Sequence, residues 1–448
     1  MRFGTDGVRG DAEHDLTGPL VVALGGAIAR VMRPERVFIG LDTRASGLRI
    51  EVELAIGLHG EGVEAVSLGV LPTPAIAFAA AREGVPAAIV SASHNRWTDN
   101  GVKVIGSDGR KLPDATEAAI EADLEAALAD ARAATHTLGD LGASFDFDAA
   151  RADAYVEHLV STLAGRRLDG LEIVLDCANG AGFDVGPRVL RAVGANVHVL
   201  YAEPNGRNIN DNCGSTYPQS LQRAVVERGA ALGLALDGDG DRVIAVDERG
   251  ELVDGDQIMT MTAIDMHAHG ELRNDAIAVT VMSNLGLRRA LRAAGIAVVE
   301  TPVGDRSVVA AMQDHDLVLG GEQSGHIVYA DYATTGDGLL TGLRVADLLR
   351  RTAQPLSALG AQMTRVPQVL VNVRVARRVD VGSSAVLADA VKRVERELGD
   401  SGRVLVRGSG TEPLVRVMIE ADAQSVADEA AERLRTVVTA EFGEADPA

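Results

Sequence analysis

The sequence predicts an α/β protein that has three related α/β domains with mixed sheets and, after them, a C-terminal α+β domain. Three apolar segments, 36–41, 171–176 and 277–282, each lead into a small polar loop and then into a helical pattern. Such a strand–loop–helix order is typical of α/β units. The chain beyond about 363 lacks this order, which indicates a separate module. A length of 448 residues allows two to four domains.

The elements of the first domain follow from periodicity and from helix-start signals. A glycine-rich stretch containing Arg9 opens the chain, and Pro72-Thr73-Pro74 begins an alanine-rich helix because proline suits a first helical turn. The other expected elements are a helix over 19–32, a strand over 36–41, a strand ending near Leu68, strands over 87–90 and 101–105, and an amphipathic helix over 114–132.

The later elements follow the same reasoning. Apolar runs predict strands at 171–176, 232–236, 277–282 and 317–319, and the tail predicts strands at 369–375, 404–406 and 415–419 with a helix over 384–398. Boundaries are therefore expected near 148, 249 and 363. They define four domains, which are 1–148, 149–249, 250–362 and 363–448.

Composition restricts the class of protein. The apolar share of 46% and the charged share of 24% are typical of a soluble globular protein. A net charge of -21 argues against nucleic acid or an anionic membrane as partner. Cys177 and Cys213 are the only cysteines, so no disulfide framework is expected. The start lacks a signal peptide and no run reaches the roughly 18 apolar residues of a membrane span, so we expect a cytoplasmic protein.

Ser93 lies in the small polar stretch Ser91-Ala92-Ser93-His94-Asn95, directly after the apolar run 87–90. Open α/β sheets bind ligands at the carboxyl ends of their strands. We therefore predict that Ser93 carries a phosphoryl group. A Ser/Asn turn that closes the strand fits this stretch alone equally well.

An acidic loop, Asp237-Gly238-Asp239-Gly240-Asp241-Arg242, follows the apolar strand 232–236. Three carboxylates on one irregular loop suit Mg²⁺, whose binding relieves their mutual repulsion. The alternative is an acidic surface turn. The spacing to Glu248 also matches a calcium-binding EF-hand loop, but Arg242 replaces the required glycine and 243–246 is strand-like, so we discount that reading.

Two further loops carry polar side chains beside glycines. Gly320 to His326 places Glu322, Ser324 and His326 together, which suits sugar hydroxyls and proton transfer; a structural loop with a satisfied histidine is the alternative. Residues 407–413, with Arg416 beyond them, suit a phosphate-binding loop, because glycines free backbone N–H groups, hydroxyls donate and guanidinium groups supply positive charge. A structural Gly/Ser turn is the alternative there.

Lysine occurs only at Lys103, Lys111 and Lys392, although the chain holds 43 lysines and arginines. Lys103 follows Asp99-Asn100-Gly101, a hairpin signal that would return it towards Ser93. An amine there could hold a phosphate or act as a base. Asp305 and Arg306 form another polar cluster, for which structural pairing and substrate contact both stay open.

Taken together, these four motif loops resemble the α-D-phosphohexomutase superfamily, in the order found there and over nearly the whole chain. The stretches 3–10, 206–216 and 334–338 are similar to the branch that interconverts glucosamine 6-phosphate and glucosamine 1-phosphate on the route to UDP-N-acetylglucosamine. Gln323 also fits that branch, since mannose and glucose mutases more often have methionine there. Arg96 before Trp97, and Tyr217, depart from the usual family pattern.

The resemblance implies an isomerase with four domains around a central active-site cleft, working through a bisphosphate intermediate. Domain I would hold the phosphoserine loop, domain II the metal loop, domain III the sugar loop and domain IV the phosphate loop. The implied roles are phosphoserine for Ser93; one Mg²⁺ on Ser93, Asp237, Asp239 and Asp241; acid or base for Lys103 and His326; sugar contacts for Glu322 and Ser324; phosphate contacts for Arg407, Ser409, Gly410, Thr411 and Arg416; and places near the phosphoryl path for Arg9 and Arg242.

Other functions compete with this prediction. A phosphomannomutase or phosphoglucomutase would use the same chemistry on another sugar. A phosphatase would let water take the phosphoryl group, and a calcium-dependent binding protein would use the Asp237 loop alone. The partners expected are small sugar phosphates, and the oligomeric state stays open, with a homodimer as the usual form in the family.

Overall fold

A computed structural model describes residues 7–129, 149–409 and 413–443 of the protein. The chain divides into two compact units. Unit 1 comprises Met1–Met282 and Gly295–Gln362, and unit 2 comprises Ser283–Ala294 and Met363–Ala448. The C-terminal module is thus joined by a short segment from the middle of the chain, which the sequence did not indicate.

Three sheets in unit 1 repeat one strand order. In each, a central strand has a parallel neighbour on both sides, and an antiparallel strand follows. The first sheet holds β1 (Val8–Asp11), β2 (Arg36–Leu41), β3 (Glu64–Val70), β4 (Ala87–Val90) and β5 (Asp99–Ile105). The second holds β6 (Glu172–Asp176), β7 (Asn196–Leu200), β8 (Leu232–Leu236), β9 (Val243–Val246) and β10 (Leu252–Val253). The third holds β11 (Ala276–Thr280), β12 (Ala297–Thr301), β13 (Leu319–Gly321) and β14 (Ile327–Tyr329).

This repetition explains where the predicted motifs lie. β4, β8 and β13 occupy the same place in their sheets, each parallel to the central strand and followed by the loop to the antiparallel strand. Ser93 follows β4, Asp237 follows β8 and Glu322 follows β13. The prediction of three related α/β units with mixed sheets is therefore confirmed, and the motif loops are equivalent loops.

Two local predictions were wrong. Asp99-Asn100-Gly101 is not a hairpin turn, because β5 begins at Asp99 and pairs with β1 there. The Asn100 side chain is buried and donates to Ser46 Oγ at 2.9 Å, so tertiary pairing overrides its turn preference. β5 still runs antiparallel to β4, with Lys103 opposite Ile89. The strand expected at 317–319 begins only at Leu319.

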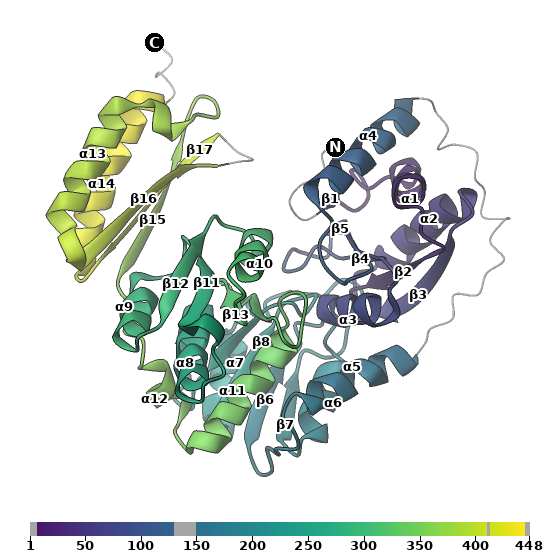
Figure 1. The fold of residues 1–448 in the computed structure, drawn as a ribbon, viewed down its shortest axis with the longest axis horizontal. Helices are drawn as coiled ribbons and strands as arrows, with labels where there is room; N and C mark the ends of the chain where they lie inside the picture. Colours follow the sequence, from purple (N-terminus) through teal and green to yellow (C-terminus); the bar gives the residue numbers. More distant parts are fainter. Residues whose placement is uncertain (1–6, 130–148, 410–412, 444–448) are drawn as a thin grey trace. The chain divides into compact units, whose positions relative to one another are not determined.

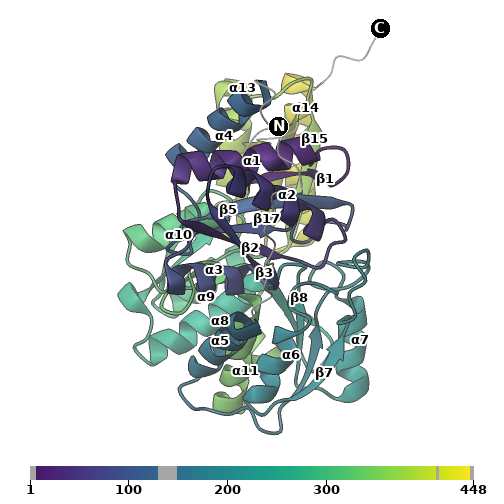
Figure 2. The same cartoon turned by 90° about the vertical axis from the view of Figure 1, so that its right-hand side faces the viewer.

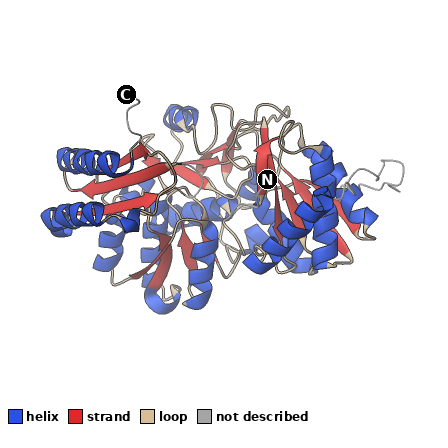
Figure 3. Ribbon diagram, turned by 90° about the horizontal axis from the view of Figure 1, so that it is seen from above, coloured by secondary structure: helices blue, strands red, loops and turns tan. Residues whose placement is uncertain are grey.

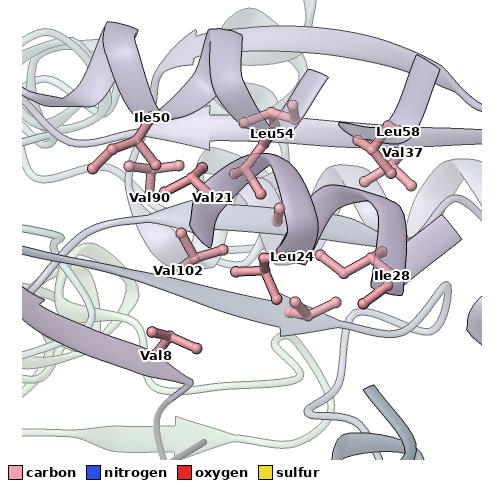
Figure 4. Close-up of a cluster of buried hydrophobic side chains, with 14 of the residues drawn as sticks. Val8, Val21, Leu24, Ile28, Val37, Ile50, Leu54, Leu58, Val90 and Val102 are labelled. Carbon is pink, nitrogen blue, oxygen red and sulfur yellow. The ribbon is translucent and has the colours of Figure 1, made fainter. Parts of the chain in front are cut away.

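The core of the first domain packs two helices against its sheet. Figure 4 shows Leu24 of α1 (Gly18–Met32) and Leu54 of α2 (Gly47–Gly60) among valines of the strands. The two helices approach closely because Gly57 has no side chain: a Cβ there would lie 2.0 Å from the carbonyl oxygen of Val22.

The helices that the structure describes in unit 1 are α1 (Gly18–Met32), α2 (Gly47–Gly60), α3 (Thr73–Glu83), α4 (Asp114–Ala129), α5 (Ala149–Ser161), α6 (Val185–Ala192), α7 (Gln219–Arg228), α8 (Gly255–Ala268), η3 (Arg273–Asp275), α10 (Asp305–Asp314), α11 (Gly338–Thr352) and α12 (Leu356–Gly360).

Helices of the second and third α/β domains pack against one another. α5, α6 and α11 are in mutual contact, and Figure 2 shows them grouped beside the second sheet. Through this contact the Tyr155 hydroxyl of α5 donates to Asp337 Oδ2 at the start of α11, at 2.8 Å. Among the helices that the structure describes, none combines the length and apolar composition of a membrane span.

Unit 2 is a two-layer α+β module, as predicted. Its sheet has the order β15 (Gln368–Arg374), β17 (Leu414–Ala421), β16 (Gly402–Gly408). Its helices are α9 (Leu285–Ala293), η4 (Val381–Ser383), α13 (Ala385–Leu398), η5 (Gly399–Ser401) and α14 (Gln424–Phe442). α13 and α14 pack together on one face of the sheet (Figure 1), and Figure 3 shows them as two blue helices beside red strands. Asn284, before α9, exchanges two 3.0 Å hydrogen bonds with the backbone of Val366.

Candidate active site

Ser93 is buried at the carboxyl end of β4, with an exposed fraction of 1%. Its backbone is left-handed, with φ of 51°, a conformation that few residues with side chains adopt. The Ser93 hydroxyl donates to Asp237 Oδ2 at 2.6 Å. The first two α/β domains therefore meet at the predicted phosphoserine.

The three aspartates of the metal loop form one buried cluster. One oxygen from each of Asp237, Asp239 and Asp241 lies within 4.8 Å of the others. Burial, with the charges of Asp241 and Asp239, raises the pKa of Asp237 well above its usual range. Asp239 Oδ1 and Asp241 Oδ1 are buried and make no hydrogen bond with any residue that the structure describes. Crowded carboxylates with open oxygens fit a hard divalent cation such as Mg²⁺.

Lys103 reaches this cluster from β5. Its Nζ lies 3.0 Å from Asp239 Oδ2, and the Thr73 hydroxyl donates to the same oxygen at 2.9 Å. Burial works to raise the pKa of Asp239, but the Lys103 charge and these hydrogen bonds lower it well below its usual range. Lys103 thus lies beside the aspartates, in the neighbourhood that the sequence predicted for it.

Arg242 and Arg9 bring positive charge to the same region. The Arg242 backbone donates to Asp237 Oδ1 at 3.2 Å, and its Nε lies 3.6 Å from Asp241 Oδ1. His94 lies between Ser93 Oγ and Arg242 Nη1, at 3.4 Å from each. Burial, then the charges of Arg242 and Arg9, lower the pKa of His94. The lowered pKa favours a neutral His94 beside the serine.

His326 is buried with both ring nitrogens against protein groups. Its Nε2 accepts from the backbone of Gly336 at 3.1 Å, and its Nδ1 lies 3.5 Å from Asp241 Oδ2. Burial works to lower the pKa of His326, but Asp241 and Asp305 raise it overall. His326 therefore contacts the metal loop through Asp241.

Glu322 and Ser324 lie half-buried in the loop between β13 and β14. Glu322 Oε1 accepts from the backbone of Gly304 at 3.1 Å, and Ser324 Oγ lies 3.5 Å from Glu322 Oε2. The charge of Glu322 is also among those that act on Arg242. The loop therefore offers a carboxylate and a hydroxyl near the Arg242 guanidinium.

The Asp305–Arg306 cluster is paired within the protein. Lys111 Nζ donates to Asp305 Oδ1 at 2.6 Å, and Arg306 forms ion pairs with Asp114 and Glu117. The sequence left structural pairing and substrate contact open for Asp305 and Arg306, and the structure shows both side chains in ion pairs within the protein.

The predicted phosphate loop belongs to unit 2. Arg407 on β16 is directly opposite Arg416 on β17. Burial, with the charge of Arg416, lowers the pKa of Arg407. The backbone of Ser409 donates to the Leu414 carbonyl at 2.8 Å, while Gly410 and Thr411 lie outside the described residues. Two facing guanidinium groups form a favourable setting for an anion.

The structure excludes one sequence alternative. Residues 243–246 form β9 and Glu248 accepts hydrogen bonds from Ser357, so the acidic loop is not an EF-hand. Arg96, which departs from the family pattern, is exposed to solvent.

Sequence reasoning missed the side chains that support the serine loop. Asp42 and Arg44 follow β2, and Asn210 comes from the second domain. The first two could have been found, because β2 is a parallel neighbour of β4 and their loops meet at one sheet edge. Asn210 lies in the stretch 206–216 that carries the family resemblance, but the resemblance gave this residue no role.

Comparison with known proteins agrees with this geometry. Models of the phosphoglucomutase/phosphomannomutase alpha/beta/alpha domains I, II and III match residues 1–130, 153–250 and 254–366, and that of the C-terminal domain matches 370–437. A curated phosphoglucosamine mutase of Rhodococcus opacus is 48% identical over 97% of this chain and 98% of its own length. That of Frankia alni is 49% identical over 98% of both chains. A crystal structure of a putative phosphomannomutase from Thermus thermophilus has a TM-score of 0.78 at 24% identity, covering 98% of this chain and 99% of the other.

Proposed function

The chain belongs to the phosphoglucomutase/phosphomannomutase family, and on that premise we propose that it interconverts glucosamine 6-phosphate and glucosamine 1-phosphate. It is an isomerase that works through a phosphoserine and a bisphosphate intermediate. The observation that carries this proposal is the buried Ser93 hydroxyl, 2.6 Å from Asp237 of the triple-aspartate loop. The choice of the amino sugar rests on the relatives named phosphoglucosamine mutase, at 48% and 49% identity.

The reaction passes one phosphoryl group out and one back. Phospho-Ser93 gives its phosphoryl group to the free hydroxyl of a sugar monophosphate, so the bond from phosphorus to Ser93 Oγ breaks as the bond to the sugar oxygen forms. The proton lost by the sugar hydroxyl is balanced by the proton that Ser93 Oγ gains. The bisphosphate then turns, and its other phosphoryl group returns to Ser93.

Asp237, Asp239 and Asp241 would hold one Mg²⁺ together with the phosphate on Ser93. When bound, this ion offsets the negative charge that spreads over the transferring oxygens. Arg9 and Arg242 add positive charge to the same region and orient the phosphoryl group. Burial of Ser93 excludes water, which protects the phosphoserine from hydrolysis.

Lys103 and His326 remain the candidate proton carriers. Lys103 Nζ lies 3.0 Å from Asp239 Oδ2 and His326 Nδ1 lies 3.5 Å from Asp241 Oδ2, so each is held beside the metal loop, and we propose that the two act as the acid and base pair. Glu322 and Ser324 would take the sugar hydroxyls. Arg407, Ser409, Gly410, Thr411 and Arg416 would take the phosphate that is not reacting.

The test is the Ser93→Ala variant assayed with glucosamine 6-phosphate. We expect conversion to glucosamine 1-phosphate to disappear, because no acceptor oxygen is left. Ser107→Ala, at an exposed serine of the same domain, is the matched control and should keep full activity. Intact-mass measurement before and after phosphatase treatment should show one removable phosphoryl group on the wild type and none on Ser93→Ala. Full activity of Ser93→Ala would overturn the proposal.

Sugar specificity has its own test. Rates on glucosamine, mannose and glucose 6-phosphates should be highest for glucosamine 6-phosphate. A higher rate on mannose or glucose 6-phosphate would replace our choice by a phosphomannomutase or phosphoglucomutase, and steady release of inorganic phosphate would indicate a phosphatase. We also propose a cytoplasmic location and a homodimer, the latter to be measured by light scattering.

A further inference from the structure

The backbone of the serine loop is held by side chains from two domains. The carbonyl oxygens of Ser93 and Asn95 each accept two side-chain hydrogen bonds. Arg44 Nη2 donates to them at 3.1 and 2.6 Å, and Asn210 Nδ2 donates to them at 2.9 and 3.0 Å. Arg44 belongs to the first α/β domain and Asn210 to the second. One pair of acceptors therefore joins both domains at the reacting residue.

Arg44 is itself fixed by burial and by charge. It forms an ion pair with Asp42 in which both side chains have an exposed fraction of 0%, and its Nε donates to the Asp99 carbonyl at 2.8 Å. Asp42 also accepts from the Ser91 hydroxyl at 2.6 Å, and Ser91 Oγ in turn accepts from the backbone of Ser93 at 2.9 Å. Both backbone groups of Ser93 are thus connected to this ion pair.

Asn210 is also fixed, by backbone contacts of its own loop in the second domain. Its backbone is left-handed, with φ of 56°, and its N–H donates to the Ala178 carbonyl at 2.9 Å. The same loop docks on the first domain through the Gly206 carbonyl, which accepts from the backbone of Ala45 at 2.8 Å. The Arg207 guanidinium lies 5.3 Å from the centre of the Trp97 ring, four residues beyond Ser93.

We propose that Asn210 is a positioning residue for phosphoryl transfer, which acts by holding the Ser93 and Asn95 carbonyls together with Arg44. A left-handed serine is strained and persists only where its surroundings fix it. Holding the two carbonyls keeps Ser93 at φ of 51° and its Oγ directed at Asp237. This inference rests on the proposed function, because it assigns a task in that reaction.

The test compares Asn210→Gly and Asn210→Asp with the wild type and with Asn212→Gly. Glycine and aspartate both tolerate the left-handed backbone, and each removes the amide donor. Asn212 has the same backbone conformation, with φ of 53°, but is exposed, and among the described residues its side chain donates only to its neighbour Asp211, so its variant controls for backbone effects. Trp97 is the only tryptophan of the chain, so its emission reports on this loop alone.

We expect kcat with glucosamine 6-phosphate to fall roughly 10- to 100-fold in both Asn210 variants, since misplacing a reacting group by about 1 Å has that effect. KM should stay within about twofold, because the carbonyl contacts do not touch the sugar. Trp97 emission should shift to longer wavelength in both, while Asn212→Gly matches the wild type.

Several results would overturn the inference. It fails if kcat and Trp97 emission are unchanged in Asn210→Gly and Asn210→Asp, or if KM and kcat change equally. If Asn210→Gly does not fold, the isosteric Asn210→Asp decides. A wild type without mutase activity would instead contradict the proposed function, so the two failures are distinguishable.

Discussion

At the scale of single residues, two chemically identical side chains have pKa values shifted in opposite directions. Asp237 and Asp239 share one buried loop, yet burial with neighbouring charge raises the pKa of the first, while the Lys103 charge lowers that of the second against the effect of burial. Position relative to Lys103, and not residue type, makes the difference. One carboxyl of the cluster therefore retains a proton that a cation must displace.

This difference predicts a proton released on Mg²⁺ binding. The raised pKa of Asp237 means that the metal-free protein holds a proton that the bound cation excludes, so affinity for Mg²⁺ should rise with pH until Asp237 is ionised. Titration calorimetry in buffers of different ionisation enthalpy measures the protons released. Asp237→Asn should bind Mg²⁺ more weakly and release none. Equal affinity at pH 5 and pH 8 for the wild type would contradict the prediction.

Gly238 is where the metal loop touches the serine loop. A Cβ at this position would lie 2.6 Å from the Ser93 carbonyl oxygen and 2.7 Å from Asn210 Nδ2. We expect Gly238→Ala to lower the free energy of unfolding by about 1–3 kcal/mol and to reduce kcat at least about tenfold. Urea unfolding and the mutase assay measure the two effects. Gly47→Ala, whose Cβ would meet nothing closer than 3.7 Å, should be nearly neutral; equal behaviour of the two variants would be the contrary outcome.

At the scale of elements, the start of α11 connects the domain packing to the site. Asp337 caps this helix by accepting from the backbone of Leu340 at 2.9 Å, and the buried Tyr155 hydroxyl donates to its other oxygen. The neighbouring Gly336 N–H donates to His326. Burial raises the pKa of Asp337 to about 6 although both hydrogen bonds oppose this. A shift of α11 would therefore move the Gly336 N–H that donates to His326.

The cap gives a prediction with a definite pH dependence. Because the pKa of folded Asp337 is about 6, above its ordinary value of 3.8, stability is lost as pH rises through this interval. Tyr155→Phe removes a donor to the ionised form and raises this pKa further. The variant should lose about 1.5–3 kcal/mol at pH 8 and clearly less at pH 5. Urea unfolding at both pH values measures this, with Tyr332→Phe, at an exposed tyrosine, as control. A pH-independent loss would refute the cap's role.

At the scale of the whole molecule, the two compact units do not coincide with continuous stretches of chain. α9 groups with the C-terminal module, where the buried Glu420 accepts from the backbone of Leu285 at 3.2 Å. Arg289 of α9 also forms an ion pair with Asp422. A helix that the sequence pattern assigned to the third α/β unit is thereby part of the C-terminal unit.

This grouping predicts the behaviour of α9 in hydrogen exchange. In the full chain, the amides of α9 should open with the free energy and urea dependence of β17, and not with those of β11. Native-state exchange at increasing urea, followed by mass spectrometry, measures both. Glu420→Gln, which weakens the bond to Leu285, should lower the protection of α9 while leaving β11 unchanged. Exchange of α9 together with β11 would contradict the grouping.

The sequence by itself determined the repeated strand–loop–helix units, the α+β module and the loops that carry Ser93, Asp237, Glu322 and Arg407. These features depend on local periodicity and on polar residues after apolar strands, both of which are written along the chain. The family resemblance added the expected roles, which stay predictions for the single residues.

Only the tertiary structure decided how the site is held. Asp99-Asn100-Gly101 became strand because β1 pairs with it, and Arg306 became a partner of Asp114 and Glu117. The support of Ser93 by Arg44 and Asn210 joins residues 49 and 117 positions from the serine. Contacts over such separations depend on how sheets and domains pack, and no local pattern encodes which side chain meets which carbonyl oxygen.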